Sequence, residues 1–214
     1  INNNKNFDNL EVMGLTTPLD IQLAYQNNML VKTVDREDWW GSTLPAMSIG
    51  YEMRLSPLHI LTFYNAFANN GKMLTPQFVS HIEEKGEVVK LFNVDVIKSR
   101  ICSQDIIDSI MPYMVDVIDK GTARKIKTDK YSIAGKTGTC ELRFWKKDSL
   151  KSYSSSFVGF FPAHEPKYSC IVVIHDFTDA SDKSHYGGDV AAPVFRQISD
   201  KVYALDRSLS YRNN

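Results

Sequence analysis

The sequence has little that could hold a metal ion, a disulfide framework or a nucleic acid. Its three cysteines (Cys102, Cys140 and Cys170) are an odd number, and neither they nor the scattered histidines have the spacing of a metal site. The 25 basic and 25 acidic residues give a net charge of zero, whereas binding phosphates requires a basic face. We therefore expect no metal, no cofactor and no nucleic-acid partner.

Long apolar segments are also lacking. No stretch approaches about 18 consecutive apolar residues, and the N-terminus does not have the pattern of a signal peptide. The chain begins at Ile1 rather than at Met, which predicts a fragment whose targeting segment lies upstream. With 214 residues and 43% hydrophobic content, the chain can form one substantial core. We expect one domain over residues 1–214, with frayed tails at 1–6 and 206–214.

Three helices are predicted from their caps and from apolar residues at helical spacing. Residues 56–71 and 103–121 each begin with a serine N-cap and end with a glycine, and Pro112 should kink the second of them or mark its weak point. The third helix begins at Asp189. The apolar faces are expected to comprise Leu58, Leu61, Tyr64 and Ala68; Ile106, Ile107, Ile110, Met114 and Val117; and Val190, Val194, Ile198, Val202 and Leu205.

Alternating apolar and polar residues predict strands at 77–83, 87–92, 131–140, 155–161 and 167–176. The first two form a hairpin around a turn at 84–86. Residues 169–174 are apolar enough for a central strand that is buried on both faces. Cys140 and Cys170 would then lie on neighbouring strands, where two buried free thiols are favoured over a facing pair. An α+β fold, with an antiparallel sheet flanked by helices, is the simplest assembly of these elements.

The tetrapeptide Lys-Thr-Gly-Thr occupies residues 136–139, in the second half of the predicted strand 131–140. A nucleotide-binding P-loop is the first alternative, because Gly-Lys-Thr at 135–137 resembles its end. That motif needs a glycine where this chain has Lys130, and it needs a helix to follow, but residues 139–145 show no helical apolar stripe. We therefore interpret the tetrapeptide as a strand motif. Lys-Thr-Gly on a strand is one of three signatures of penicillin-binding proteins and serine β-lactamases.

The other two signatures are absent from the sequence. No serine has a lysine three positions later, and Ser-x-Asn does not occur. Those motifs would supply the nucleophile and its proton relay. The chain therefore resembles one wall of an acyl-transfer site, without the residue that attacks.

Three further segments accompany the tetrapeptide in chain order: Ala-Met-Ser-Ile-Gly-Tyr at 46–51 with Leu-Ser-Pro-Leu at 55–58, Gly-Thr-Ala at 121–123, and Tyr-Gly-Gly at 186–188 with Ala-Ala-Pro-Val-Phe at 191–195. Together the segments resemble the C-terminal part of the transpeptidase domain of class B penicillin-binding proteins, and the division-type members most closely. The resemblance runs from about Phe7 to about Leu205. Four motifs in a fixed order are far more specific than any one of them.

This resemblance implies a function for the parent protein. It would be a D,D-transpeptidase that cross-links peptidoglycan stem peptides ending in D-Ala-D-Ala through an acyl-serine intermediate, and β-lactams would acylate the same serine. It would carry an N-terminal membrane anchor and face the periplasm or the outer cell surface, with division-complex membrane proteins as candidate partners. The 214-residue chain alone is expected to be inactive, because the nucleophilic serine, its paired lysine and Ser-x-Asn are missing.

Residues 136–139 would form an edge strand along which the acyl donor lies as an extra strand. Strand alternation places the lysine and the glycine on one face and the two threonines on the other, and Gly138 leaves room for the substrate backbone. By resemblance, Lys136 supplies positive potential beside the nucleophile and helps to move protons. The Thr137 and Thr139 hydroxyls would hold the substrate carboxylate, and the Thr139 N–H would be one of the two oxyanion donors.

Tyr186, Gly187 and Gly188 are interpreted as a loop that closes onto the site before the last helix. In the resembling family an aromatic residue just before this Gly-Gly lines the acyl pocket, so Tyr186 would form a wall of the substrate pocket. The alternative is that the glycines merely make the turn while Tyr186 packs on the core. His185 is expected at the rim of the site, because this family's proton relay does not need a histidine.

Two positions depart from the family pattern. Glu52 stands where a glycine is common after Gly-Tyr, so the turn there is expected to differ. Cys140 and Glu141 replace a small residue and a frequently basic neighbour, and Glu141 would weaken the attraction for an anionic ligand. The charged segment 144–153 is expected to be a solvated loop between strands.

Two other functions stay open at this point. A serine β-lactamase or β-lactam sensor could share Lys-Thr-Gly, but it would not be expected to show the Gly-Tyr and Tyr-Gly-Gly segments. Fast turnover of penicillin would favour a lactamase. A non-catalytic, transpeptidase-like module could instead bind cell-wall peptide or a division partner, and its parent would lack the upstream serine or lysine.

Overall fold

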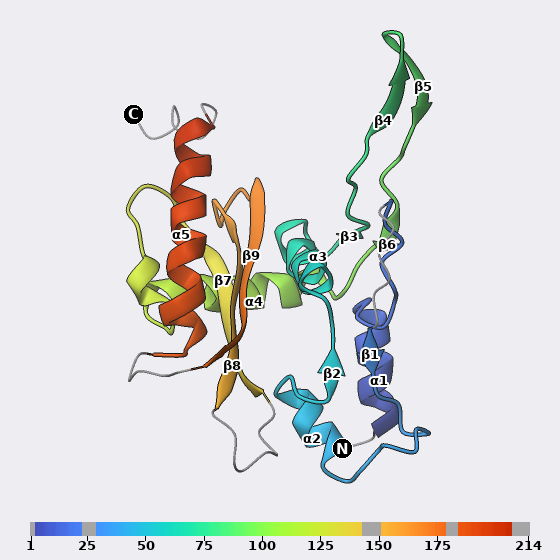
Figure 1. Cartoon of the computed structure of the whole chain (residues 1–214), viewed down its shortest axis with the longest axis vertical. Coiled ribbons are helices and arrows are strands. Elements are labelled where there is room, and N and C mark those ends of the chain that lie inside the picture. Colours follow the sequence, from blue (N-terminus) through green and yellow to red (C-terminus); the bar gives the residue numbers. More distant parts are fainter. Residues whose placement is uncertain (1–2, 23–28, 143–150, 179–183, 207–214) are drawn as a thin grey trace. The chain divides into compact units, whose positions relative to one another are not determined.

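The computed structural model describes residues 3–22, 29–142, 151–178 and 184–206 (Figure 1). They fall into two compact units, Ile1–Ile107 and Asp108–Asn214, which we describe separately. The single domain expected over residues 1–214 stays a prediction. So do the frayed tails, of which residues 1–2 and 207–214 lie outside the described ranges. Within those ranges, no helix is both long and apolar enough to cross a membrane.

The first unit is built from short elements: α1 (Asn3–Val12), β1 (Leu30–Val31), α2 (Thr43–Ser48), β2 (Met53–Arg54), α3 (Pro57–Ala68), β3 (Met73–Leu74), β4 (His81–Glu84), β5 (Glu87–Leu91) and β6 (Val96–Lys98). Its strands form antiparallel pairs, β1 with β2, β3 with β6 and β4 with β5. Ala66, Met73 and Ile101 form a small buried cluster against Phe63 and Phe67.

Helix α3 confirms the predicted cap at Ser56. The Ser56 hydroxyl oxygen accepts a hydrogen bond from the His59 N–H at 3.2 Å, and Pro57 occupies the first helical turn. Beyond the helix, Gly71 has a φ of +85°, a left-handed conformation that glycine adopts at no steric cost. The predicted helix at 56–71 is therefore present as α3.

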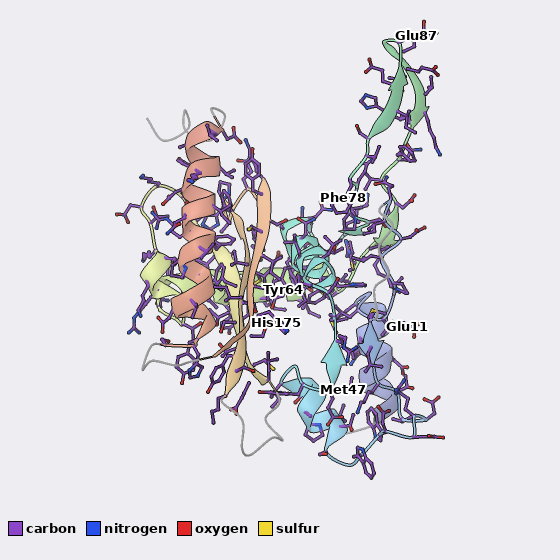
Figure 2. The ribbon with its side chains drawn as sticks, viewed as in Figure 1. Glu11, Met47, Tyr64, Phe78, Glu87 and His175 are labelled. Atoms are coloured by element: carbon purple, nitrogen blue, oxygen red, sulfur yellow. The ribbon has the colours of Figure 1, made fainter. Side chains whose placement is uncertain are left out.

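Strands β4 and β5 confirm the predicted hairpin. Its turn lies at Lys85 and Gly86, whose φ angles are +53° and +87°. β4 begins at His81, so the first strand is shorter than predicted. Every residue of both strands is exposed, and Figure 2 shows Glu87 at the tip of the hairpin and Phe78 nearer its base.

The second unit contains most of α4 (Gln104–Asp119, which begins in the first unit), the 3-10 helix η1 (Arg124–Ile126), β7 (Ala134–Leu142), β8 (Ser152–Phe161), β9 (Tyr168–Thr178) and α5 (Gly187–Leu205). The strands form an antiparallel sheet in the order β7-β8-β9, and α5 packs along it (Figure 1). Phe157, Phe161 and Phe195 lie in the core between the sheet and the helix. The predicted α+β fold is confirmed.

The order of the strands differs from the prediction. β9 is an outer strand of the described sheet, and residues 169–174 are only partly buried, so the expectation of a central strand buried on both faces is wrong. The central strand is β8, in which Ser152 and Ser155 are fully buried. Serine is mostly exposed in proteins, so the serines of β8 do not indicate that this strand is central and buried.

Strand β7 begins at Ala134, later than the predicted start at residue 131. The Tyr131 hydroxyl instead contacts the hydroxyl of Ser199 and donates to the carboxylate of Asp200 in α5, at 2.8 and 2.9 Å. Burial of Tyr131 raises its pKa to about 12, so this hydroxyl keeps its proton at neutral pH. These contacts tie the segment before β7 to α5 and hold it out of the ladder.

The buried faces of the helices also differ from the expected stripes. In α5, Val194, Ile198 and Leu205 were expected to be buried, but they are 38%, 40% and 82% exposed. The fully buried side chains of α5 are instead Ala191, Ala192, Phe195 and Ser199. Small residues on this face let the helix approach the sheet closely around one large aromatic ring, which an apolar stripe alone does not reveal.

The other two helices show smaller shifts of the same kind. α4 runs without a break through Pro112; its Ile106 is 48% exposed, whereas Ile118, outside the expected stripe, is buried. In α3 the expected stripe is only half-buried. The buried residues of α3 are His59, Thr62 and Ala66.

All three cysteines are free and half-buried. Cys140 of β7 is opposite Ser154, and Cys170 of β9 is opposite Gly159, so β8 separates the two thiols. The expectation that Cys140 and Cys170 lie on neighbouring strands is therefore wrong.

Candidate active site

The Lys-Thr-Gly-Thr motif lies in β7, in a regular ladder opposite residues 155–158 of β8. In the part of the sheet that the structure describes, no strand pairs with the other edge of β7. An edge of this kind presents backbone N–H and C=O groups that an extended peptide can pair with. Lys136 is exposed on this strand, and its ammonium donates to the carbonyl oxygen of Thr137 at 2.9 Å.

Thr137 and Thr139 share one face of β7, as the regular alternation of the strand requires. The Thr139 hydroxyl oxygen accepts the N–H of Gly187 at 3.0 Å. The Thr137 hydroxyl is hydrogen-bonded to the hydroxyl of Thr122 at 2.9 Å. A hydroxyl that accepts one hydrogen bond can still donate its own proton, so Thr139 is held in place and can still bind a carboxylate.

Gly187 and Gly188 are fully buried where α5 meets β7. A Cβ at Gly187 would collide with the carbonyl oxygens of Gly138 and Ser156, and a Cβ at Gly188 would collide with that of Thr122. Only glycine therefore allows the first turn of α5 to come this close. The two glycines bring the helix N-terminus to the threonines, and their own contact with substrate stays a prediction.

The segment before α5 carries Tyr186, whose side chain is 60% exposed. Tyr186 lies against His185, with ring centroids 4.5 Å apart, and His185 stacks on Tyr153 of β8 at 4.0 Å. The hydroxyl of Ser155 donates to the carbonyl oxygen of His185. Tyr153 and Ser155 of β8 therefore hold His185 in place, while the ring of the adjacent Tyr186 stays accessible to solvent.

Asp189, in the first turn of α5, connects two other segments. One carboxylate oxygen accepts from the ammonium of Lys125 in η1, and the other accepts from the Ser184 hydroxyl at 2.5 Å. The Lys125 and Ser184 hydrogen bonds lower the pKa of Asp189, against the effect of its partial burial. Asp189 is therefore a carboxylate at neutral pH, at the helix end where a negative charge is favourable.

Sequence reasoning missed several of these supporting residues. The Gly-Thr-Ala segment at 121–123 is visible as a motif, but its sequence does not indicate the contact of Thr122 with Thr137. Lys125 and Ser155 carry no local signal, because each acts through a partner distant in sequence; 64 positions separate Lys125 from Asp189 and 30 separate Ser155 from His185. Ser184 contacts Asp189 only five positions away, but no sequence pattern marks that contact. Only the folded arrangement of β7, β8 and α5 brings them together.

Glu141 follows the motif at the far end of β7. Its carboxylate lies 3.4 Å from the Lys151 ammonium, and its side chain is 30% exposed. This ion pair offsets part of the repulsion that Glu141 was expected to exert on an anionic ligand. Of the loop predicted at 144–153, residues 144–150 lie outside the described ranges. Ser152 and Tyr153 belong instead to β8, where both are buried, so the expectation of a solvated loop is wrong for these two residues.

The segment at 46–58 belongs to the first unit and is described by itself. Glu52 has a φ of +54°, so the backbone takes the left-handed conformation for which a glycine is suited. The Glu52 carboxylate accepts hydrogen bonds from the Lys32 ammonium at 3.0 Å and from the Thr43 hydroxyl at 2.8 Å. Both hydrogen bonds lower the pKa of Glu52, and the bond from Lys32 has the larger effect.

Comparison with known proteins adds the following matches. The family model described as the penicillin binding protein transpeptidase domain matches residues 2–200. Peptidoglycan D,D-transpeptidase FtsI of Buchnera aphidicola subsp. Baizongia pistaciae is 26% identical over 194 residues, which are 90% of this chain and 32% of the relative. Probable peptidoglycan D,D-transpeptidase PbpC of Pseudomonas aeruginosa is 28% identical over 187 residues, 87% of this chain and 30% of the relative. The chain thus spans about a third of the length of these curated relatives.

Solved structures show the same fold. Apo penicillin-binding protein 3 of Mycobacterium tuberculosis matches with a TM-score of 0.76 at 24% identity, over 92% of this chain and 45% of that one. The TP domain of Burkholderia pseudomallei penicillin-binding protein 3 matches with a TM-score of 0.74 at 20% identity, over 97% and 59%. The M. tuberculosis protein has also been solved in complex with aztreonam and with ampicillin.

Proposed function

The chain belongs to the family of penicillin-binding protein transpeptidase domains, and we propose that it forms one wall of the active site of a peptidoglycan D,D-transpeptidase. The observation that carries the proposal is the arrangement on β7. An exposed Lys136 and two fixed threonine hydroxyls lie on a strand whose outer edge is not paired in the described sheet. This combination suits the recognition of an extended peptide that ends in a carboxylate.

In the proposed reaction, the stem peptide adds to the outer edge of β7 through main-chain hydrogen bonds. The hydroxyls of Thr137 and Thr139 bind the terminal carboxylate of D-Ala-D-Ala, and the small Gly138 lets the peptide backbone approach. Tyr186 forms a wall of the acyl pocket; its exposed ring, supported by His185, is consistent with this role.

A serine elsewhere in the parent protein attacks the penultimate carbonyl carbon and expels the last D-Ala, whose amine takes up a proton. Lys136 keeps the potential beside that serine positive and assists proton transfer. The Thr139 N–H donates to the oxyanion, for which removal of one donor costs about 100- to 1000-fold in rate. A second stem peptide's amine then attacks the acyl-serine, which forms the cross-link and regenerates the serine.

β-Lactams are proposed as inhibitors of the same site, because their carboxylate and strained amide present the same two groups to β7. Aztreonam and ampicillin complexes of the structurally similar M. tuberculosis protein support this ligand class. For the parent we further propose action at the outer side of the cytoplasmic membrane, through an N-terminal anchor, and contact with division-complex proteins. The FtsI-like relatives support this assignment.

The test is mass spectrometry of the parent protein after incubation with penicillin, followed by peptide mapping. We expect one stable adduct on a serine outside residues 1–214, formed at least tenfold more slowly in Lys136→Ala. Lys120→Ala is the matched control, because Lys120 is an exposed lysine of the same unit whose only role shown is an ion pair with Asp116. This chain by itself is expected to form no adduct.

Other outcomes separate the competing functions. A folded parent that forms no adduct contradicts the proposal and favours a module that only binds cell-wall peptide. An adduct that turns over rapidly indicates a β-lactamase. Equal acylation rates in the two lysine variants would contradict the role proposed for Lys136.

A further inference from the structure

Asp189 occupies a position from which it can control the geometry of the candidate site. It is in the first turn of α5, next to the glycines that pack against β7. Its two carboxylate oxygens have different partners, the Lys125 ammonium and the Ser184 hydroxyl. Ser184 in turn accepts the N–H of Tyr186 at 3.4 Å. We call these three residues, Lys125, Ser184 and Asp189, the Asp189 bridge.

The bridge joins the two segments that flank the threonines of β7. On one side, Lys125 follows shortly after Thr122, whose hydroxyl contacts Thr137. On the other side, Ser184 begins the segment that carries Tyr186 into α5, where the Gly187 N–H contacts Thr139. A change in the bridge can therefore reach each threonine hydroxyl through a short stretch of backbone followed by one hydrogen bond, from Thr122 to Thr137 on one side and from Gly187 to Thr139 on the other.

The bridge also affects charge. A lone carboxylate at this position would repel an anionic substrate, but Lys125 neutralises it at direct contact. Asp189 is 26% exposed and Lys125 is 67% exposed, so as an ion pair near the surface they contribute little to overall stability. An ion pair can hold residues 184–188 in place even if it adds little to the free energy of unfolding of the whole protein.

We propose that Asp189 is a positioning residue that, through Lys125 and Ser184, holds residues 184–188 against β7 and so sets the affinity of the site for the carboxylate end of the acyl donor. This inference rests on the function proposed above. Asp189 does not touch the substrate; it acts on Tyr186 through Ser184 and on the threonines through the start of α5. The step it controls is the binding that precedes acylation.

The test separates geometry from charge. In the parent protein, the double variant Lys125→Met with Asp189→Ala removes the bridge while leaving the net charge unchanged. The matched control is Lys120→Met with Asp116→Ala, which removes an exposed ion pair of the same unit, in which the Lys120 ammonium lies 3.0 Å from an Asp116 carboxylate oxygen. Stopped-flow acylation with a fluorescent penicillin gives the dissociation constant of the first complex and the acylation rate constant separately.

We expect the bridge variant to raise the dissociation constant roughly tenfold, because small displacements of binding groups have effects of this size or more. Its acylation rate constant should stay within about threefold of the wild type, and the control variant should change neither constant by more than about twofold. Lys125→Arg keeps the pair and should remain close to the wild type. Ser184→Ala, a milder change, should raise the dissociation constant about threefold without loss of folding.

The outcomes distinguish this inference from the function on which it rests. If the wild-type parent is acylated but the bridge variant binds penicillin as the control does, the positioning role is wrong and the proposed function stands. A second outcome also contradicts the positioning role. If the bridge variant weakens binding and slows acylation by the same factor, and its melting temperature falls while that of the control does not, the variant is generally destabilised. If the wild-type parent is not acylated at all, both the function and this inference fail.

Discussion

The β4–β5 hairpin and the β7–β8 pair are both antiparallel ladders, yet they differ in what covers them. Every residue of β4 and β5 is exposed, including apolar residues such as Val88 and Leu91. In the second unit α5 packs along the sheet, and Phe157 of β8 is fully buried against it. Both regions pair antiparallel through the backbone, β7–β8 regularly and the hairpin with one register shift between Ile82 and Glu83. Burial is the larger difference, and it decides which ladder can hold a site rigidly.

The same contrast applies to the motif itself. On an exposed ribbon, threonine hydroxyls would be free to rotate and would lose entropy on binding a ligand. On β7 each of the two threonine hydroxyls already has a partner from a neighbouring segment, Thr122 or Gly187. Preorganisation of this kind is how a strand edge becomes a binding site.

The largest expected effect tests the difference in burial directly. Phe157→Ala removes a side chain that lies 4.8 Å, centroid to centroid, from Phe195, and it should cost about 3–5 kcal/mol of unfolding free energy. Val88→Ala, at a side chain 58% exposed in the hairpin, should change stability by less than about 0.5 kcal/mol. Urea unfolding of the parent protein measures both. Similar losses in the two variants would show that the hairpin is covered in solution.

A second prediction concerns the approach of α5 to β7. Gly187→Ala introduces a methyl group against two backbone carbonyls, so the helix must shift at a cost of about 1–3 kcal/mol. The shift should also remove the Gly187–Thr139 hydrogen bond and slow acylation by penicillin at least tenfold. Gly41→Ala is the control in the first unit, because a Cβ there meets no atom within 4 Å. Unchanged acylation in Gly187→Ala would show that the Thr139 contact is dispensable.

The sequence predicted where helices and strands occur better than it predicted which of their residues are buried. Caps and periodicity located α3, α4 and α5, and alternation located the hairpin and all three strands of the sheet. The errors concern burial: β8 was not recognised as central because Ser155 is polar, and the buried face of α5 was missed because Ala191 and Ser199 are small. Burial is decided by the partner surface, and periodicity carries no information about that partner.

In the candidate site too, local patterns could be predicted from the sequence, whereas the contacts between segments could not. The motif at 136–139 and the segment at 186–188 could be identified from local sequence, because each is a contiguous pattern. The sequence predicts that residues 186–188 close onto the site, but it does not predict the hydrogen bond from the Gly187 N–H to Thr139, since that bond depends on how closely α5 packs on the sheet. Glu52 is a case in which the sequence predicted a change that the backbone does not show. The resemblance predicts a different turn because glutamate replaces a common glycine, yet Glu52 has a φ of +54°, a conformation that suits glycine.

Glu52 allows a third prediction, of intermediate size. Glu52→Ala removes the hydrogen bonds to Lys32 and Thr43 but keeps the left-handed backbone, so it should cost about 1 kcal/mol after allowance for solvent screening. Glu52→Gly loses the same bonds but should be less destabilising, because it relieves a conformation that costs a non-glycine residue about 1 kcal/mol. Thermal unfolding of the two variants decides the order, and a more stable alanine variant would contradict it.

The pH dependence of Glu52 follows from its lowered pKa. Its contribution to stability is present above the pKa of an unfolded glutamate, about 4.3, and is lost as the pH falls through the lower value of the folded state. Glu52→Gln should therefore lower stability at pH 7 without changing its slope with pH there, and should flatten the dependence of stability on pH below about pH 4.3. A flattened curve near pH 6 would assign the effect to another group.

The smallest expected effect concerns His59, which is fully buried in the first unit. Its Nε2 donates to the carbonyl oxygen of Thr17 at 3.2 Å, and its Nδ1 lies 3.1 Å from the Ser56 hydroxyl. Burial, the larger influence, lowers the pKa of His59, while the hydrogen bond to Thr17 acts in the opposite direction. The folded state therefore takes up a proton less readily than the unfolded chain does.

It follows that stability due to neutral His59 is complete above about pH 6.5 and declines as the pH falls below that value towards the pKa of the folded state. Unfolding free energies measured between pH 7.5 and 5 should show this slope, and His59→Gln should reduce it. His164→Gln, at an exposed position of the second unit, is the matched control and should retain the slope. If His59→Gln leaves the slope unchanged, another group carries the proton. If the slope is also absent from the wild type, the buried ring is more accessible to water than the hydrogen bonds to Thr17 and Ser56 imply.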